Sequence, residues 1–149
     1  TDGTVEAAFV NDVVSTVDSL YRTVPDKEHR AIAGLSIGAM QSMYISANSP
    51  SSFGYIGLFS SMVHPVLRKS DYSSFYRHLK AKMREQFVAP PELYYIMVGK
   101  TDIYYPRMMS FSRYLEKKGY PFEFYITEGG HQWYNWEKYS EIFMQSLWR

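Results

Sequence analysis

The chain has 149 residues, which is enough for one domain with a substantial core, and its 46% hydrophobic and 21% charged residues are close to the globular average. A net charge of +1 gives no electrostatic basis for binding nucleic acid or an anionic membrane surface, and no apolar run approaches the roughly 20 residues of a membrane span. The absence of cysteine excludes disulfides, a thiol nucleophile and cysteine-ligated metal sites.

The first third of the chain predicts a helix, a buried strand and a second helix. Apolar residues recur at three- and four-residue spacings from Val5 to about Thr23, which is typical of an amphipathic helix. Residues 31–35 read Ala-Ile-Ala-Gly-Leu, a short apolar run that indicates a buried parallel strand. Helical spacing returns from Ile37 to Ala47, before Pro50 ends the pattern.

The rest of the chain alternates strands with helices. The polar, irregular residues from about 60 to 91 predict a lid-like insertion. We expect strands at 53–59, 93–98 and 122–127, and helices at about 73–87, 106–118 and 133–148. This order predicts a single α/β domain over residues 1–149, with a parallel sheet and helices on both of its faces.

In such a sheet, ligands bind beyond the carboxyl ends of the strands. The residues to inspect for chemistry are therefore those that directly follow each predicted strand. They are Ser36, residues 60–64, residues 99–102 and residues 128–131.

Residues 34–38 read Gly-Leu-Ser-Ile-Gly, a G-x-S-x-G pattern between a predicted strand and a predicted helix. A sharp turn of this kind lifts the serine hydroxyl clear of the sheet, and the glycines let strand and helix approach closely. The pattern predicts Ser36 as a nucleophile and the backbone N–H of Ile37, at a helix N-terminus, as an oxyanion donor. The alternative is an ordinary strand-to-helix turn built from small residues.

A serine nucleophile needs a base to take its proton. The order serine, acid, histidine predicts His131, which follows the last strand in the glycine-containing stretch 128–131. His29 precedes the first strand and His78 lies in the insertion, whereas His64 follows the second strand and could line the site. The alternative role for His131 is to cap the last helix.

Asp102 directly follows the third strand, at the edge where Ser36 and His131 are expected. Its carboxylate would fix the histidine tautomer and stabilise the imidazolium. The alternative role for Asp102 is to cap the following helix, and Glu128 is a rival acid that lies close to His131 in sequence.

Three further residues are expected to contact substrate at this edge, namely Met62, His64 and Trp133. Core packing of the last helix is the alternative for Trp133. The sequence holds no glycine-rich phosphate loop and no cluster with metal-ligand spacing, so we expect neither a cofactor nor a metal.

Four stretches of the chain together resemble the putative-esterase (esterase D-like) family of α/β-hydrolases, which includes feruloyl and acetyl-xylan esterases of carbohydrate esterase family 1 and enterochelin esterases. The stretches are residues 11–23, 30–39, 99–102 and 129–136, the last being similar to the family's G-G-H-x-W-x-x-W. The resemblance implies the α/β-hydrolase fold and a triad of Ser36, Asp102 and His131. Ile37 and Ala39 stand where the family usually has Met and Gly.

The resemblance also implies a serine carboxylic-ester hydrolase that works through an acyl-enzyme on carbohydrate-linked feruloyl or acetyl esters. A siderophore esterase and a catalytically impaired hydrolase-like binding domain are the alternatives. The family association favours a secreted or periplasmic protein, although the chain itself fixes no compartment.

The family's fold begins with strands that this chain lacks, including the loop with the second oxyanion donor. We therefore expect a C-terminal portion of the fold, whose first strand presents an unpaired apolar edge. That edge would pair with a second copy of the chain or with the missing N-terminal part. Loss of one oxyanion donor typically lowers the rate by about 10²–10³.

Overall fold

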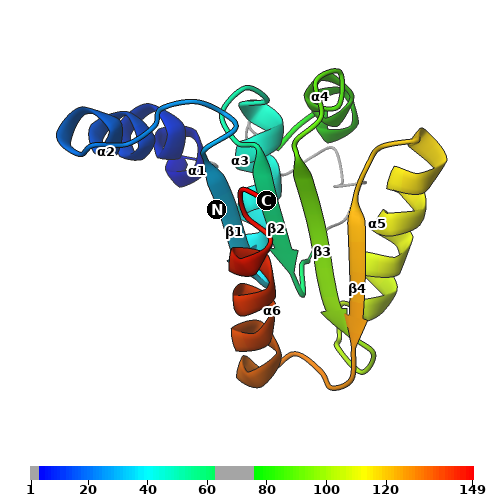
Figure 1. Cartoon of the computed structure of the whole chain (residues 1–149). Coiled ribbons are helices and arrows are strands. Elements are labelled where there is room, and N and C mark those ends of the chain that lie inside the picture. The colour runs from blue at the N-terminus through cyan, green and yellow to red at the C-terminus, as the bar shows by residue number, and fades with distance from the viewer. Residues whose placement is uncertain (1–3, 63–75) are drawn as a thin grey trace.

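The computed structural model describes residues 4–62 and 76–149. Within these residues, four parallel strands form one sheet in the order β1-β2-β3-β4 (Figure 1). The strands are β1 (Ala31–Leu35), β2 (Tyr55–Phe59), β3 (Leu93–Gly99) and β4 (Glu123–Thr127). Each strand pairs with the next one along the chain, so the carboxyl ends of all four meet at one edge of the sheet.

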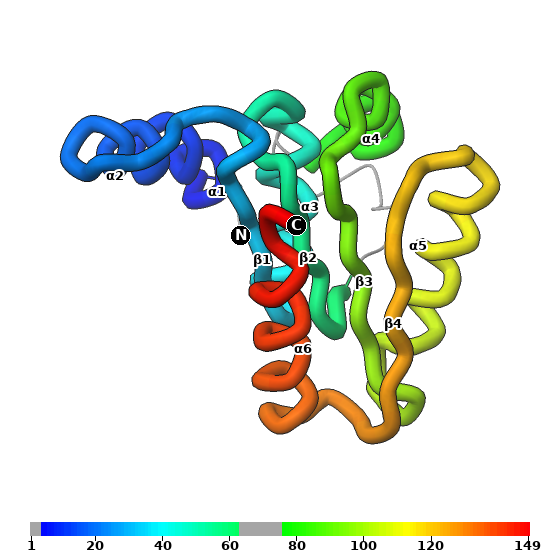
Figure 2. The backbone as a smooth tube through the Cα atoms, viewed as in Figure 1, coloured from blue at the N-terminus to red at the C-terminus, as the bar shows by residue number. Residues whose placement is uncertain are grey.

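Helices cover both faces of this sheet, as the sequence predicts (Figures 1 and 2). One face carries α3 (Ile37–Asn48), α4 (Leu79–Gln86) and α5 (Tyr105–Lys118), and the other carries α6 (Trp133–Gln145). The strand order explains this division. Right-handed crossovers between consecutive neighbouring strands place every crossover helix on the same face, and only α6, which follows the last strand, returns across the opposite face.

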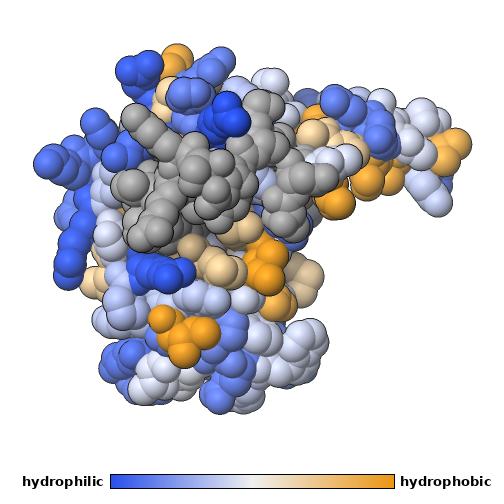
Figure 3. All heavy atoms as spheres, turned by 180° about the vertical axis from the view of Figure 1, so that it is seen from behind, coloured by the Kyte–Doolittle hydropathy of each residue, from blue (hydrophilic) through white to orange (hydrophobic). Residues whose placement is uncertain are grey.

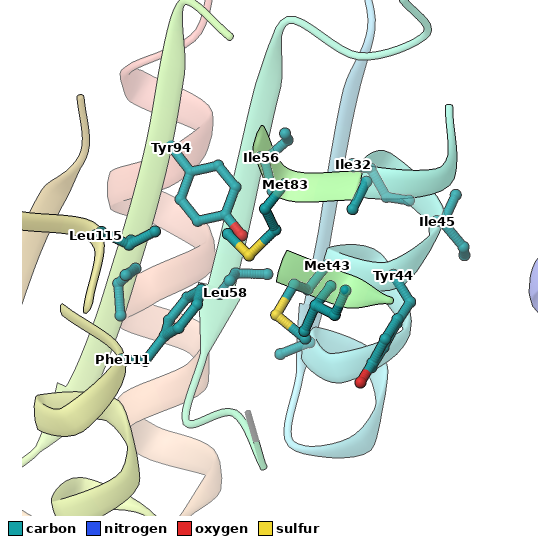
Figure 4. Close-up of a cluster of buried hydrophobic side chains, with 14 of the residues drawn as sticks. Ile32, Met43, Tyr44, Ile45, Ile56, Leu58, Met83, Tyr94, Phe111 and Leu115 are labelled. Carbon is teal, nitrogen blue, oxygen red and sulfur yellow. The ribbon is translucent and has the colours of Figure 1, made fainter. Parts of the chain in front are cut away.

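The two faces of the sheet have separate apolar clusters, because alternate side chains of a strand point to opposite faces. In β2, Ile56 and Leu58 pack with the helices α3, α4 and α5, whereas Tyr55 and Phe59 pack with α6. Figure 4 shows the first of these clusters around Met43 of α3. Every residue of β2 and β3 is buried, as expected for central strands with helices on both sides.

The predicted N-terminal helix is present but has three parts: α1 (Thr4–Ala8), a π-helical stretch η1 (Phe9–Val14) and α2 (Ser15–Leu20). It ends at Leu20 and not near Thr23, because the chain turns to an extended conformation at Tyr21. This helical segment projects sideways beyond β1 (Figure 1).

Only the early part of the N-terminal apolar stripe reaches the core, where Phe9, Val10 and Val14 pack against the cluster beneath α3. Val17 and Leu20 stay 40% and 70% exposed. A hollow of about 530 Å³ separates the segment from β1, and the apolar atoms beside it are visible along the projecting arm in Figure 3.

Strand β1 has a strand partner on one side only, which is β2, within the part of the chain that the structure describes. The expectation that its other edge pairs with a second copy or with further polypeptide stays a prediction. Sedimentation of the purified chain would check it, because a strictly monomeric species at high concentration argues against self-pairing.

Besides the end of the N-terminal helix, three predicted boundaries differ from the structure by two or more residues. Strand β2 begins two residues later than expected, and α6 ends at Gln145 instead of Trp148. Helix α4 begins at Leu79 because His78 adopts a left-handed conformation, which an α-helix cannot continue through. The lid-like insertion expected at about 60–91 stays a prediction, since residues 63–75 lie outside the described residues. Among the described helices, none is both long enough and apolar enough to cross a bilayer.

Candidate active site

Ser36 occupies the turn between β1 and α3, as the G-x-S-x-G pattern predicts. Its φ of 53° and ψ of −114° lie outside the regions that non-glycine residues ordinarily occupy. The Ser36 N–H donates to the carbonyl oxygen of Phe59 at 2.8 Å, which fastens the turn to the end of β2. Strained backbone that is held in place by its surroundings is common at functional sites, and here it sets the position of the Ser36 hydroxyl.

The close approach of β1 and α3 depends on Gly34. A Cβ at this position would lie 2.3 Å from the backbone carbon and oxygen of Gly38, which is too close for any neighbour to accommodate. A Cβ at Gly38 would meet nothing within 4 Å. The structure therefore requires glycine at only one of the two glycine positions of the motif.

We predict that Gly34→Ala lowers the free energy of unfolding by about 1–3 kcal/mol, because α3 must move away from β1. Gly38→Ala is the matched control and should leave the stability unchanged or raise it by up to about 1 kcal/mol, since alanine is the better helix former. Urea unfolding of both variants measures the difference. Equal stability of the two variants would contradict this account of the turn.

The structure brings Ser36, His131 and Asp102 into one hydrogen-bonded row. The Nε2 atom of His131 lies 3.0 Å from the Oγ of Ser36. Its Nδ1 lies 3.2 Å from Oδ1 and 3.1 Å from Oδ2 of Asp102. With Nδ1 protonated, the ring donates to the carboxylate and its Nε2 accepts from the serine hydroxyl. The three residues follow β1, β4 and β3, whose carboxyl ends share one edge of the sheet.

Asp102 lies against the His131 ring, and it is not the N-cap residue of α5, because that residue is Tyr104. The Asp102 side chain is fully buried, and its Oδ1 also accepts a hydrogen bond of 2.8 Å from the backbone N–H of Tyr104, just before α5. The carboxylate is thus fixed by the turn that starts the helix and by the histidine ring at the same time. A carboxylate fixed in this way is suited to hold the neighbouring imidazole ring in one orientation.

The rival acid, Glu128, faces solvent. Its carboxylate pairs with the ammonium group of Lys100, and both side chains are more than half exposed. The hydrogen bond from Lys100 to Glu128 and the negative charge of Glu128 raise the pKa of Lys100. Asp102 and not Glu128 therefore lies against the His131 ring.

Two aromatic rings pack against the imidazole of His131. The ring centroids of Tyr104 and Trp136 lie 5.1 Å and 4.9 Å from it, both in edge-to-face orientation. Trp133, which was expected to contact substrate, is 64% exposed and lies 5.8 Å from the Trp136 ring. The alternative of a helix cap for His131 is not what the structure contains, because Gln132 is the N-cap residue of α6.

A family model described as Putative esterase matches residues 6–139. A protein of Xylanibacter ruminicola named endo-1,4-beta-xylanase/feruloyl esterase is 30% identical over 146 residues, which cover 97% of this chain and 18% of that protein. The chain belongs to the Putative esterase family.

Solved structures share the fold of this esterase-family chain, which is that of the α/β-hydrolases. Fluorophosphonate-binding serine hydrolase F of Staphylococcus aureus superposes with a TM-score of 0.79 at 17% identity, covering 95% of this chain and 62% of that one. The CE1 ferulic acid esterase of the anaerobic fungus Anaeromyces mucronatus gives 0.76 at 18% identity, with 95% and 52% covered. The chain thus spans between half and two thirds of these structures.

The oxyanion donor expected in this esterase-family chain lies at the start of α3. The N–H of Ile37 belongs to the first turn of the helix, where N–H groups have no acceptor within the helix and the helix dipole favours negative charge. Its role as a donor to an oxyanion stays a prediction.

The other residues singled out in the sequence have varied positions. Met62 is half-buried and lies just beyond β2, at the edge that carries Ser36, whereas His64 lies outside the described residues. His29 pairs with Asp26 before β1, at the opposite end of the sheet. Within the described residues, no group of three or more histidine, aspartate or glutamate side chains has the arrangement of a metal site.

Proposed function

We propose that the protein is a serine carboxylic-ester hydrolase, with Ser36 as nucleophile, His131 as general base and Asp102 as the acid that orients the histidine. The observation that carries this proposal is the continuous row of hydrogen bonds from the Ser36 hydroxyl through the imidazole to the buried carboxylate. A serine hydroxyl at neutral pH needs such a partner to become an effective nucleophile. Membership of an esterase family supports the proposal independently.

In the proposed mechanism, the Ser36 oxygen attacks the ester carbonyl carbon while the Nε2 of His131 takes the hydroxyl proton. The carbonyl π electrons move onto oxygen, and the Ile37 N–H at the start of α3 donates to this oxyanion. The tetrahedral intermediate then collapses, the bond to the alcohol oxygen breaks, and His131 returns its proton to that oxygen. Water attacks the resulting acyl-serine by the same route and releases the acid.

For the substrate, we propose an ester of an aromatic or acetyl acid with a carbohydrate. Large exposed apolar side chains follow each of the three residues Ser36, Asp102 and His131 in sequence, within three positions. They are Ile37, Ile103, Trp133 and Tyr134, which are 53–71% exposed. Flat aromatic surfaces suit the rings of a feruloyl group or the apolar face of a sugar. The similarity to a xylanase/feruloyl esterase favours the same class.

A panel of methyl ferulate, acetylated xylan and a siderophore ester tests this choice, with kcat/KM measured for each. We expect methyl ferulate or acetylated xylan to give the highest value, and Trp133→Ala to raise KM for methyl ferulate more than for 4-nitrophenyl acetate. The highest value on the siderophore ester would overturn the substrate class. Hydrolysis of none of the esters by a folded protein would overturn the enzyme proposal and favour a binding domain.

A further inference from the structure

The loop that carries His131 joins β4 to α6 over only a few residues, and two of them are glycines. Gly129 has a φ of 86°, which residues other than glycine rarely adopt. A glycine-containing loop is intrinsically mobile, yet the Nε2 of His131 must stay within hydrogen-bond reach of Ser36. Some further contact must therefore hold the loop in place.

Asn135, in the first turn of α6, supplies this contact. Its side chain is buried, with 2% exposure, and its Nδ2 donates to the carbonyl oxygen of Glu128 at 3.2 Å and to that of Gly130 at 3.0 Å. Gly130 directly precedes His131. Both hydrogens of one amide group thus hold the backbone on the N-terminal side of the histidine.

The same amide lies against the loop that carries Asp102. The N–H of Thr101 donates to the carbonyl oxygen of Gly129 at 3.0 Å, which joins the β3–α5 and β4–α6 loops, and these loops run together at one end of the molecule in Figure 2. A Cβ at Gly99 would lie 2.1 Å from the Gly129 oxygen and 2.9 Å from the Asn135 Nδ2. The absence of side chains at Gly99 and Gly129 creates the space that the Asn135 amide fills.

We propose that Asn135 is a positioning residue, which holds His131 in line with Ser36 and Asp102 by fixing the loop before it. This inference rests on the proposed function. The Asn135 amide donates to backbone carbonyl groups of Glu128 and Gly130, so it acts through the backbone on the N-terminal side of the histidine. A displacement of the base of the order of 1 Å lowers catalysis by about 10²-fold even when the residues themselves remain.

The test uses Asn135→Asp, which keeps the shape of the side chain and replaces the donor with an acceptor, and Asn135→Ala as a second variant. Tyr139→Phe is the matched control, because Tyr139 is also buried in α6 and its hydroxyl hydrogen-bonds the side chain of Thr127 at the end of β4. We expect both Asn135 variants to lower kcat for 4-nitrophenyl acetate by about 10–10²-fold with KM nearly unchanged. Tyr139→Phe should keep kcat within about twofold of the wild-type value, while its melting temperature falls about as much as that of the Asn135 variants.

A second readout does not depend on activity. The proton between the Nδ1 of His131 and the Asp102 carboxylate gives a far-downfield NMR resonance when the ring is held in place. We expect this resonance to be lost or broadened in both Asn135 variants and kept in Tyr139→Phe and Ser36→Ala. Its retention in Asn135→Asp, or a kcat for that variant equal to the control, overturns the positioning role. If the wild-type protein hydrolyses no ester, the proposed function fails, but the resonance still decides for or against the role of Asn135.

Discussion

Ser36→Ala is expected to lower kcat for ester hydrolysis by about 10⁴–10⁶-fold, the largest effect of any single substitution in the chain. The reason is chemical, because this substitution removes the hydroxyl that lies 3.0 Å from the Nε2 of His131 and that the proposed mechanism uses as the nucleophile. The folded structure should remain intact, since alanine fits the turn and removes only an oxygen atom. Initial rates with 4-nitrophenyl acetate, together with circular dichroism to establish folding, measure the effect.

Ser42→Ala is the matched control for this substitution. Ser42 is a buried serine in α3, more than one turn beyond Ser36. Its replacement should leave kcat unchanged. If Ser36→Ala kept a tenth or more of the wild-type kcat, another residue would have to supply the nucleophile, and the proposed mechanism would be wrong.

Asp102→Asn is expected to lower kcat by about 10⁴-fold while preserving the fold. The asparagine oxygen can still accept from the Tyr104 N–H, so the turn before α5 keeps its geometry. Its NH₂ group, however, would donate to the Nδ1 of His131 and favour the tautomer that carries the proton on Nε2. A ring in that state cannot take the proton of Ser36, and the neutral amide no longer stabilises an imidazolium.

Glu128→Gln is the control for this charge removal. Glu128 lies within three residues of His131 in sequence, but its carboxylate pairs with Lys100 at the surface. We expect a kcat within about twofold of the wild-type value, because exposed ion pairs contribute little. The kcat values of both variants, measured at several pH values, give the comparison. A larger loss of kcat in Glu128→Gln than in Asp102→Asn would show that Glu128, and not Asp102, orients His131.

The row of three residues was predictable from the sequence for a physical reason. Parallel strands present their carboxyl ends at one edge, so residues that directly follow β1, β3 and β4 must gather there even when they are 95 positions apart, as Ser36 and His131 are. The glycines near Ser36 and His131 in sequence also predicted the tight turns that carry these two residues. Short apolar runs located all four strands to within two residues.

Other features depend on contacts that periodicity does not encode. The apolar stripe of the N-terminal helix indicates which side is apolar but not what covers it, and Val17 remains exposed beside β1. The start of α4 depends on the left-handed backbone of His78, a residue type with no strong local signal for it. The role of Asn135 became visible only with the positions of Gly99 and Gly129, which lie on two different loops.

The most direct test of the central claim is peptide mass spectrometry of the protein after reaction with a fluorophosphonate. We predict one covalent adduct, on the peptide that contains Ser36, with labelling slowed by several orders of magnitude in His131→Ala. An adduct on a different serine, or labelling of Ser36 at the wild-type rate without His131, would show that the hydrogen-bonded row does not activate the hydroxyl.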